Sequence, residues 1–427
     1  MMTYAEAMAY LHGLAMFGSR FGLETTRRLA EAAGNPQQQL RFIHVAGTNG
    51  KGSTCAMLES IYRAAGLRVG LFTSPHLVSF RERMQVNRQL ISETDVARLV
   101  QAVLMDQRSG LDPNHPPTLF EFVTVMALRY FAEQRCKLVI WETGLGGRLD
   151  ATNIVTPLAS VITNIALDHQ QWLGATLAKI AAEKAGIIKP HVPVFSGAVA
   201  PEAELVIRST AEQNHAPFTH MTHALETDAS AGGPLTLPLP GAHQRRNAAL
   251  AVAVVEGLQQ QLPVSQAALR HGLETVHWAG RFQRAQIGGR EFVLDGAHNL
   301  DGVQALAAAL RETYPDQRLA LVVGMLADKD WELMAATLAP LGHRFATVRV
   351  SSARTLEPTL LVAALQRANP SAQVTAHATV ADALAAVDTE PRVVVAGSLY
   401  LIGEALEKLG LATVPGEREL NEWQPTR

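Results

Sequence analysis

The sequence predicts an α/β protein with two domains, for three reasons. Short β-branched runs alternate with alanine- and leucine-rich helical segments, which is typical of a parallel sheet covered by helices on both faces. The 427 residues suffice for two hydrophobic cores. The alternation also restarts at Glu291 after an irregular stretch. We therefore expect one domain over residues 1–288 and a smaller one over residues 289–427.

Composition excludes several classes of protein. Charged residues make up 18% of the chain and hydrophobic residues 48%, which indicates a compact globular protein and not a disordered one. The formal net charge of −2 leaves no broad basic surface for nucleic acid. The longest uncharged stretch, residues 151–167, contains two asparagines and a proline and is too polar to span a membrane. We expect neither nucleic acid nor a membrane as a partner.

The cysteines and the N-terminus indicate the compartment. Cys55 and Cys136 lie far apart and form no CxxC pair, which argues against a disulfide framework or a thiolate zinc site. Residues 1–22 lack a basic segment and have the pattern of an amphipathic helix, not of a signal peptide. These observations favour the reducing cytoplasm.

The first half of the chain contains three apolar runs that predict strands. They cover residues 40–45, 138–141 and 160–163. Each is followed by a polar or glycine-rich loop, where parallel sheets place their ligands. We therefore expect the chemistry in those loops.

The pattern is less regular after Pro190. Residues 232–241 hold too many prolines and glycines for a central element, so we expect turns at the surface there. A helix is expected over about residues 244–261, followed by a turn at residues 288–289. Four more strands then alternate with helices, and residues 421–427 have the composition of a loose tail.

The sharpest local signal is FIHVAGTNGKGST, residues 42–54, in which a strand runs into a glycine-rich loop and then a helix. Glycines let backbone amides converge on phosphate oxygens, and the helix N-terminus adds its dipole. Lys51 supplies a charge for the phosphates, and Ser53 or Thr54 supplies a hydroxyl for Mg²⁺ or phosphate. The strict GxxxxGK[ST] pattern is not met, because Val45 stands in place of its first glycine, so an ordinary glycine-rich turn is the alternative. The candidate nucleotide-binding residues of this loop are Gly47, Thr48, Asn49, Gly50, Lys51, Gly52, Ser53 and Thr54.

Glu142 is the second candidate, at the end of the apolar strand in VIWETGLGGRLDATN. A carboxylate in that place would give a phosphate-bound Mg²⁺ a hard oxygen ligand. The alternatives are that Glu142 caps a neighbouring helix and that Asp150 pairs with Arg148. The preceding phosphate loop favours the metal role.

The third candidate segment contains Asp168, His169 and Lys184. The first two end a strand-like run, and Lys184 lies on the helix that follows, which is expected to begin near residue 175 or 176. Taken alone, an Asp-His pair is more often a solvated loop, and a Glu-Lys pair is usually on the surface.

The second domain also has polar groups at predicted strand ends. They are Asp295, His298, Asn299, Lys329 and Ser398. We expect a polar cluster that faces the first domain. Helix capping by Asp295 and Ser398 is the alternative.

These motifs together resemble the folylpolyglutamate synthases and bifunctional dihydrofolate synthases of the Mur ligase superfamily. The matching segments, in order, are GTNGKGST, FTSPHL, ERMQVN, ETGLGGRLDATN, ITNIALDH, AAEKAGIIK, GRFQ, DGAHN, DKD and AGSLYLIGE. The resemblance covers nearly the whole chain. It implies an N-terminal P-loop ATPase-like domain and a smaller C-terminal Rossmann-like domain, with ATP and the substrates in the cleft between them.

The resemblance also implies roles for single residues. Lys51 and the loop amides would hold the ATP phosphates, and Lys184 would carry a carbamate that supports the second of two Mg²⁺ ions. The implied Mg²⁺ ligands are Ser74, Glu142 and His169. From the other side of the cleft, Asn247, Arg281 and Asp295 would reach the nucleotide, and His298 and Ser398 would lie near the incoming glutamate. The implied catalytic residues are Lys51, Lys184 and His298.

The implied reaction is ATP-dependent. ATP phosphorylates a carboxylate, and the amine of L-glutamate attacks the acyl phosphate. Residues 16–29 and 118–124 resemble the bifunctional bacterial type, which uses 7,8-dihydropteroate and tetrahydrofolate. Phe120 and Phe122 would contact the pterin, and the alternative is that both are core residues at helical spacing. We expect a monomer.

Other functions explain less of the sequence. A folylpolyglutamate synthase without the dihydropteroate activity remains open. A P-loop phosphotransferase or nucleotide switch would account for the phosphate loop, but it would give DGAHN and the second domain no function. A cell-wall Mur ligase usually has a separate N-terminal domain for its uridine nucleotide. A non-catalytic binding protein would need no such set of charged groups.

Overall fold

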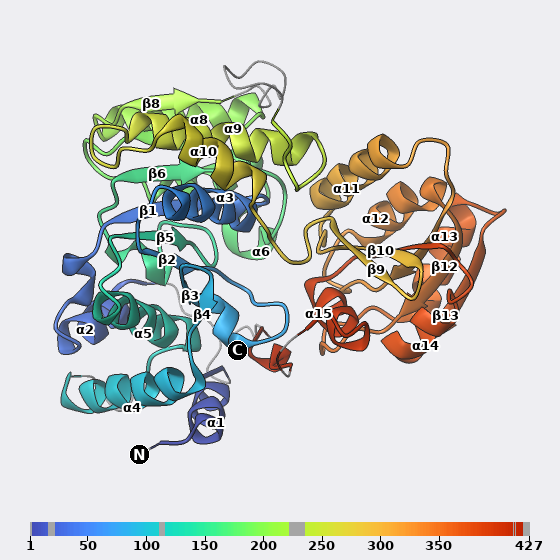
Figure 1. Ribbon diagram of the computed structural model, residues 1–427, viewed down its shortest axis with the longest axis horizontal. Helices are drawn as coiled ribbons and strands as arrows, with labels where there is room; N and C mark the ends of the chain where they lie inside the picture. Colours follow the sequence, from blue (N-terminus) through green and yellow to red (C-terminus); the bar gives the residue numbers. More distant parts are fainter. Residues whose placement is uncertain are drawn as a thin grey trace.

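The computed structural model describes residues 2–15, 22–110, 116–221, 235–412, 414 and 416–421. It contains two sheets, each packed between helices, which confirms the predicted α/β class (Figure 1). Among the described residues, no helix is both long and apolar enough to cross a lipid bilayer.

The first sheet has eight strands in the order β4-β3-β2-β5-β1-β6-β7-β8. Their bounds are β1 (Phe42–Ala46), β2 (Val69–Phe72), β3 (Met84–Val86), β4 (Gln89–Leu90), β5 (Leu138–Glu142), β6 (Ala159–Ile162), β7 (Val194–Ser196) and β8 (Phe218–His220). All neighbours are parallel except β2–β3 and β3–β4 at one edge. β1 and β5 are buried along their whole length, as parallel strands covered on both faces should be. The three predicted strands are confirmed as β1, β5 and β6.

Helices cover both faces of this sheet. They are α1 (Tyr4–Ala15), α2 (Glu24–Ala32), α3 (Lys51–Ala64), α4 (Glu93–Gly110), α5 (Leu119–Glu133), α6 (Gln170–Leu173), α7 (Leu177–Ala185), α8 (Pro201–Gln213), α9 (Ala242–Gly257) and α10 (Gln266–Glu274), with 3₁₀ turns η1 (Pro36–Gln39), η2 (Phe80–Arg83) and η3 (Ala151–Ile154). Alternate strand residues point to opposite faces. Phe72 and Trp141 pack with α1, α2, α4 and α5, whereas Leu71 and Ile140 pack with α3, α9 and α10 (Figure 1).

The second sheet has six strands in the order β13-β12-β11-β14-β10-β9, and only β9 is antiparallel to its neighbour. The strands are β9 (Gln283–Ile287), β10 (Arg290–Asp295), β11 (Leu319–Val323), β12 (Gly342–Val348), β13 (Gln373–His377) and β14 (Arg392–Ala396). The helices are α11 (Leu300–Thr313), α12 (Trp331–Leu338), α13 (Pro358–Ala368), α14 (Val380–Ala385) and α15 (Leu399–Lys408), with 3₁₀ turns η4 (Ala339–Leu341) and η5 (Arg418–Asn421). Helices α11 to α13 share one core with this sheet, and α14 and α15 share the other.

The second sheet begins a few residues before the predicted boundary. β9 starts at Gln283 and pairs with β10, so a break after residue 288 would cut this hairpin at its turn. Gly288 and Gly289 have φ angles of 57° and 78°, which confirms the glycine turn. The end of the run GRFQRAQ, from Gln283 onward, is therefore already part of the second sheet.

One expectation about the loops is confirmed in part and another is wrong. Residues 235–240 form no helix or strand and expose Thr236 and Pro238, as expected, but Leu235 and Leu239 are buried in the core beside α3 and α9. Asn421 is not part of a loose tail, because it hydrogen-bonds with Arg83 and with the backbone of His76. The rest of the tail, residues 422–427, and the first six residues of the matching segment 16–29, residues 16–21, lie outside the described residues.

Glu291 ties the second sheet together. It is 5% exposed, and its Oε1 accepts hydrogen bonds from Arg284 Nε at 2.6 Å and Tyr314 Oη at 3.0 Å. Its Oε2 accepts one from Arg392 Nε at 2.7 Å. Burial alone would raise the pKa of Glu291, but these donors outweigh it and lower the pKa below the ordinary 4.5.

We predict that Glu291→Gln lowers the thermal unfolding midpoint at pH 7 by several degrees, because the change weakens a buried charge network by about 2 kcal/mol. The lowered pKa means that the stabilisation is present above the unfolded value of 4.5 and is lost as the pH falls below it. The gap between the two proteins should therefore close in acid, as circular dichroism melts would measure. Glu332→Gln is the control, since Glu332 is 64% exposed and lies 3.9 Å from its partner. A constant gap from pH 7 to pH 3 would contradict the prediction.

Candidate active site

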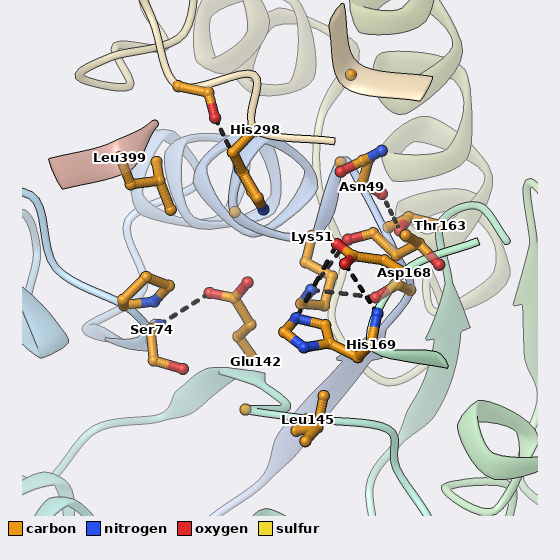
Figure 2. A pocket seen from close by; sticks show the side chains of 18 of the residues that line it. Asn49, Lys51, Ser74, Glu142, Leu145, Thr163, Asp168, His169, His298 and Leu399 are labelled. Carbon is orange, nitrogen blue, oxygen red and sulfur yellow. Dashed lines mark hydrogen bonds and ion pairs between the residues drawn. The ribbon is translucent and has the colours of Figure 1, made fainter. Parts of the chain in front are cut away.

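The carboxyl ends of β1, β5 and β6 and those of β10, β11 and β14 face one cavity of about 480 Å³. Residues of both sheets' loops line it, and Figure 2 shows side chains from both approaching the same space. The predicted site residues that line it are Gly47, Thr48, Asn49, Gly50, Lys51, Gly52, Ser53, Ser74, Phe120, Glu142, His169, Lys184, Asn247, Arg281, Asp295, His298 and Ser398. The fold therefore brings together segments that are up to 350 residues apart in the sequence.

The phosphate loop has a backbone that only glycine can follow. Gly47 has a φ of 154°, and a Cβ on it would lie 1.9 Å from Oγ1 of Thr163. Gly50 has a φ of 84°, and a Cβ on it would lie 2.6 Å from Oδ1 of Asn247. The loop is thus pressed against β6 and α9, which explains the glycines of the motif.

Lys51 begins α3 and folds back over the loop. Its Nζ donates to the carbonyl of Gly47 at 3.0 Å and lies 3.3 Å from that of Thr48. The ammonium is thereby held at the N-terminus of a helix, where an anion would be most stable. This is the arrangement that a bound phosphate group requires.

Glu142 lies at the end of β5 and is 4% exposed. Its Oε2 accepts a hydrogen bond from the backbone N–H of Ser74 at 3.1 Å (Figure 2). Burial raises the pKa of Glu142 to about 7, although Lys51 opposes the rise. A buried carboxylate with so little compensation gains from a cation beside it.

His169 sits in the same wall, at the start of α6. Burial lowers its pKa to about 4, so the imidazole is neutral at pH 7 and can donate a lone pair to a metal. No three His, Cys, Asp or Glu side chains in the described part of the chain come together as a metal cluster. A hydroxyl from Ser74, the Glu142 carboxylate and the His169 imidazole nevertheless form a donor set that suits a divalent ion whose remaining ligands are phosphate oxygens or water.

Lys184 projects from α7 into the same region and is 4% exposed. Its Nζ donates to the carbonyl of Gly47 at 2.8 Å. Burial, and then the charge of Lys51, lower the pKa of Lys184 to about 7, so a large fraction of the amine is neutral near pH 7. The helix begins with Thr176 as its N-cap, as the sequence predicts, and the neighbouring Glu183 pairs with Arg148 on the surface.

A group of six polar residues, which we call the polar clamp, joins the two domains. Its members are Asn49, Asn164, Asp168, Asn299, Asp301 and Lys329. Asp301 accepts from Asn49 at 2.7 Å and from Asn164 at 3.0 Å. Asp168 accepts from Lys329 at 2.5 Å and from Asn299 at 2.9 Å.

The ion pair at the centre of the clamp is buried. The side chains of Asp168 and Lys329 are 8% and 9% exposed. Burial would raise the pKa of Asp168, but the surrounding positive charge, with Lys329 in contact, keeps it below the ordinary range. The Asp-His segment is therefore not a solvated loop but part of a domain contact.

The second-domain candidates have defined local roles. Asp295 accepts from the backbone N–H groups of Phe282 and Ala297 at 2.8 and 2.9 Å. It does not cap α11, because Asn299 does so. Ser398 caps α15, as the alternative interpretation proposed, and it also lines the cavity.

His298 presents one ring nitrogen to the cavity. Its Nδ1 lies 2.8 Å from the carbonyl of Gly296, so Nδ1 carries the hydrogen and Nε2 keeps its lone pair. Burial, and then Lys329, lower the pKa of His298 to about 4. Figure 2 shows its ring reaching toward Lys51 and Glu142 from the opposite side.

Two predicted site residues do not reach the cavity. Phe122 is fully buried and packs edge-to-face on Tyr10, so the core interpretation holds for it, whereas Phe120 lines the cavity and also packs, partly buried, against the same core. Thr54 is also fully buried, and its hydroxyl has no hydrogen-bond partner in the described structure. Helical spacing explains both, because Phe120 and Ser53 face the cavity and the neighbouring positions turn inward.

Three residues of the site have no role in the sequence interpretation. They are Arg83, Asn164 and Asp301, all of which line the cavity. Each lies in or beside a matching segment, ERMQVN, ITNIALDH or DGAHN. The matching segments could therefore have pointed to these three residues. Nothing in the local sequence indicates that the side chains of Asn164 and Asp301 meet across the two domains.

Family comparisons agree with this two-domain site. The Mur ligase middle domain matches residues 45–255, and the Mur ligase glutamate ligase domain matches residues 280–399. The dihydrofolate synthase/folylpolyglutamate synthase of Bacillus subtilis is 39% identical over 362 residues, which cover 80% of this chain and 84% of that protein.

Solved structures show the same likeness. Escherichia coli FolC in complex with DHPP and ADP has a TM-score of 0.85 and 31% identity, with 96% of this chain and 98% of that one covered. The bifunctional folylpolyglutamate synthase/dihydrofolate synthase of Yersinia pestis, complexed with AMPPNP and a Mn ion, has a TM-score of 0.82 and 30% identity, with 96% and 98% covered.

We predict that Lys329→Met opens the contact between the domains, because it leaves Asp168 buried without a cation, at a cost of about 3 kcal/mol. Small-angle X-ray scattering should show a larger radius of gyration, and the thermal midpoint should fall. Lys408→Met, an exposed position on α15, is the matched control. Unchanged scattering together with an unchanged midpoint in the Lys329 variant would show that the clamp does not hold the domains.

Proposed function

This chain belongs to the Mur ligase family, within its group of dihydrofolate and folylpolyglutamate synthases, and on that premise we propose that the cavity between its domains joins L-glutamate to pteridine substrates. The protein is an ATP-dependent ligase that acts on folates. The observation that carries the proposal is the convergence of the phosphate loop, Glu142 and Lys184 with the second-domain loops on one cavity.

The reaction needs an activated acyl group, because a carboxylate is a poor acyl donor. A carboxylate oxygen of the pteridine substrate attacks the γ-phosphorus of ATP, and the bond from that phosphorus to ADP breaks. The amine nitrogen of glutamate then attacks the acyl carbon, and the bond from that carbon to the phosphate oxygen breaks. Inorganic phosphate and one proton leave with the amide product.

The first domain holds the phosphates. Lys51 would move from the carbonyls of its own loop to the phosphate oxygens, which offer it a full negative charge instead of a dipole. Ser74, Glu142 and His169 would hold Mg²⁺, which when bound neutralises charge on the transferring phosphoryl group. Ser53 offers a second hydroxyl at the start of α3.

Lys184 is suited to become a carbamate. Its neutral amine nitrogen would attack the carbon of carbon dioxide and lose a proton, which turns a cation into an anion that can ligate a second Mg²⁺. The burial of Lys184 and its pKa of about 7 support this role, because only the neutral amine is nucleophilic. The change also removes the repulsion between Lys184 and Lys51.

The second domain would position the amine of the incoming glutamate. His298, with the lone pair of Nε2 free, would accept a hydrogen bond from the glutamate amine, and Ser398 would lie beside it. The low pKa of His298 would rise once phosphate anions enter the cavity, so it can take up the released proton. Arg281 and Asn247 would contact the nucleotide, and Asp295 would act by fixing the loop before His298. The buried contacts of the polar clamp would exclude water from the acyl phosphate.

Phe120 supports two pteridine substrates. It lines the cavity, and its ring lies 6.1 Å from that of Phe72 at a tilt of 39°. A flat pterin can stack in such an aromatic wall. Both 7,8-dihydropteroate and tetrahydrofolate present a carboxylate to the same phosphoryl donor, so one centre can serve both reactions.

A monomer in the cytoplasm completes the proposal. Both cysteines are buried and free, in keeping with a reducing compartment.

We predict that the purified chain uses both acceptors. Incubation with ATP, Mg²⁺ and L-glutamate should give dihydrofolate from 7,8-dihydropteroate and a longer glutamate chain from tetrahydrofolate, with ADP formed in step. Chromatography of the products and a coupled ADP assay would measure both. Glutamylated tetrahydrofolate without dihydrofolate would reject the double activity but keep the ligase, and use of neither acceptor would reject the folate function.

We also predict that Lys184→Ala loses most turnover, at least about 100-fold, because charge stabilisation at the transferring phosphoryl is removed. A short carboxylate added to the assay should restore part of the rate, since it replaces the carbamate anion. Lys179→Ala, an exposed lysine on the same helix, should keep its activity. A high-resolution map with nucleotide and Mg²⁺ that shows a bare amine at Lys184 would contradict the carbamate.

A further inference from the structure

Arg83 is a buried cation in the cavity wall. The proposed reaction assigns no role to Arg83. It ends η2, within the segment ERMQVN, and is 5% exposed while it borders the cavity. In the described part of the chain, no carboxylate oxygen lies within 4.0 Å of its guanidinium. A buried arginine without a carboxylate partner is rare, because desolvation of the charge is costly.

The contacts of Arg83 are all with neutral acceptors. Its Nε donates to Nδ1 of His76 at 3.0 Å, and its Nη2 donates to Oδ1 of Asn421 at 2.8 Å. His76 is neutral in this arrangement, because its Nε2 carries the hydrogen that is donated to the carbonyl of Glu417 at 2.9 Å. Nη1 of Arg83 makes no hydrogen bond to any described residue. Burial lowers the pKa of Arg83 to about 10, so it still carries its charge at pH 7.

The end of the chain holds this guanidinium in place. Glu417 accepts hydrogen bonds from Tyr4 Oη at 2.6 Å and from Ser79 Oγ and the N–H of Phe80 at 2.9 Å each. Asn421 donates to the carbonyl of His76 at 2.8 Å. The C-terminal segment is thereby fixed on the loop that leads from Ser74 to Arg83, and Asn421 lines the cavity beside Arg83.

The place of Arg83 in the cavity indicates which of the entering anions it can bind. It lies on the first domain next to the loop of Ser74, because its carbonyl accepts a hydrogen bond from the N–H of Thr73 at 3.2 Å, whereas the phosphate loop and Lys51 would serve ATP. In the second domain Lys329 is paired with Asp168 and Arg354 with Asp328, and the proposed function assigns the incoming glutamate to His298 and Ser398. Of the anions that enter the cavity, this leaves a carboxylate of the acyl donor for Arg83. The negative charge of Glu142 raises the pKa of Arg83 and so helps to keep the guanidinium charged.

We propose that Arg83 binds the non-reacting carboxylate of a glutamylated folate, with Asn421 and His76 as its positioning residues. This inference rests on the proposed function. A folate that already carries glutamate has one carboxylate that reacts and a second one a short saturated tether away, whereas dihydropteroate has only the reacting one. Arg83 would thus hold the folates for chain extension and leave the dihydropteroate reaction without this contact.

The test compares the two reactions in one variant. Arg83→Met keeps the length of the side chain and removes its charge. We expect the KM for tetrahydrofolate to rise at least about tenfold, because a charge-assisted hydrogen bond to a carboxylate is lost, with KM and kcat for dihydropteroate within about twofold of wild type. Arg83→Lys should recover part of the loss. Asn421→Ala should raise the KM for tetrahydrofolate by a smaller factor, because the guanidinium remains but loses an anchor.

Arg81→Met is the matched control. Arg81 lies in the same 3₁₀ turn, but its side chain points to the carbonyl of Ile91 and to Glu93. It should leave the ratio of the two activities unchanged. The KM values for ATP and for glutamate should stay at wild-type level in Arg83→Met, and a rise in either one with the folate KM unchanged would reassign the bound anion and overturn the proposal.

Ligand binding gives a readout that does not depend on turnover. Calorimetric titration of folate and of pteroate, which lacks the glutamate, should show a preference for folate that Arg83→Met abolishes. An equal loss for both ligands, or an equal fall of both activities, would make Arg83 a structural residue and overturn the proposal. Failure of the wild-type chain to bind either ligand would instead overturn the proposed function itself.

Discussion

Two lysine ammonium groups converge on one carbonyl oxygen, that of Gly47, and the chemistry of the site depends on this crowding. Lys51 reaches the oxygen from the start of α3 at 3.0 Å, and Lys184 reaches it from α7 at 2.8 Å. Only glycine fits at this position, because Oγ1 of Thr163 lies 1.9 Å from the place that a Cβ on Gly47 would take. A neutral oxygen satisfies both donors only in part, so the site attracts anions.

The same crowding sets the protonation of the surrounding groups. Burial and Lys51 together bring the pKa of Lys184 to about 7, and burial brings that of Glu142 to about the same value from below. Desolvation and the nearby charge of Lys329 lower the pKa of His169 and of His298, although the side chain of His169 is still 38% exposed. Lys184 and Glu142 are therefore close to a change of charge at pH 7, and entry of a polyanion with a divalent cation would shift the protonation of both.

The described residues of the two domains meet at several places, among them an ion pair between Arg245 and Glu312, and two of these contacts border the ligand cavity. The polar clamp links the phosphate loop and Asp168 to α11 and Lys329. The C-terminal segment returns from the second domain to α1 and to the loop before Arg83. Tyr400 of α15 also donates to the carbonyl of Asn421 at 2.8 Å. A movement of the second domain would therefore change the contacts of both the polar clamp and the C-terminal segment.

Elements that depend on interactions between residues close in the chain could be predicted from the amino-acid sequence. The glycine-rich run between a strand and a helix predicted the phosphate loop, the apolar runs predicted β1, β5 and β6 together with four strands of the second sheet, and the Gly-Gly pair predicted the turn after β9. Tertiary structure alone decided which of two neighbouring side chains faces the cavity, as with Phe120 against Phe122 and Ser53 against Thr54. It also decided that Asp301 meets Asn49 and that Asn421 meets Arg83, about 250 and 340 residues apart along the chain. The physical reason is that the direction of a side chain depends on how a helix is rotated against its sheet. A contact between domains depends on packing that no local pattern encodes.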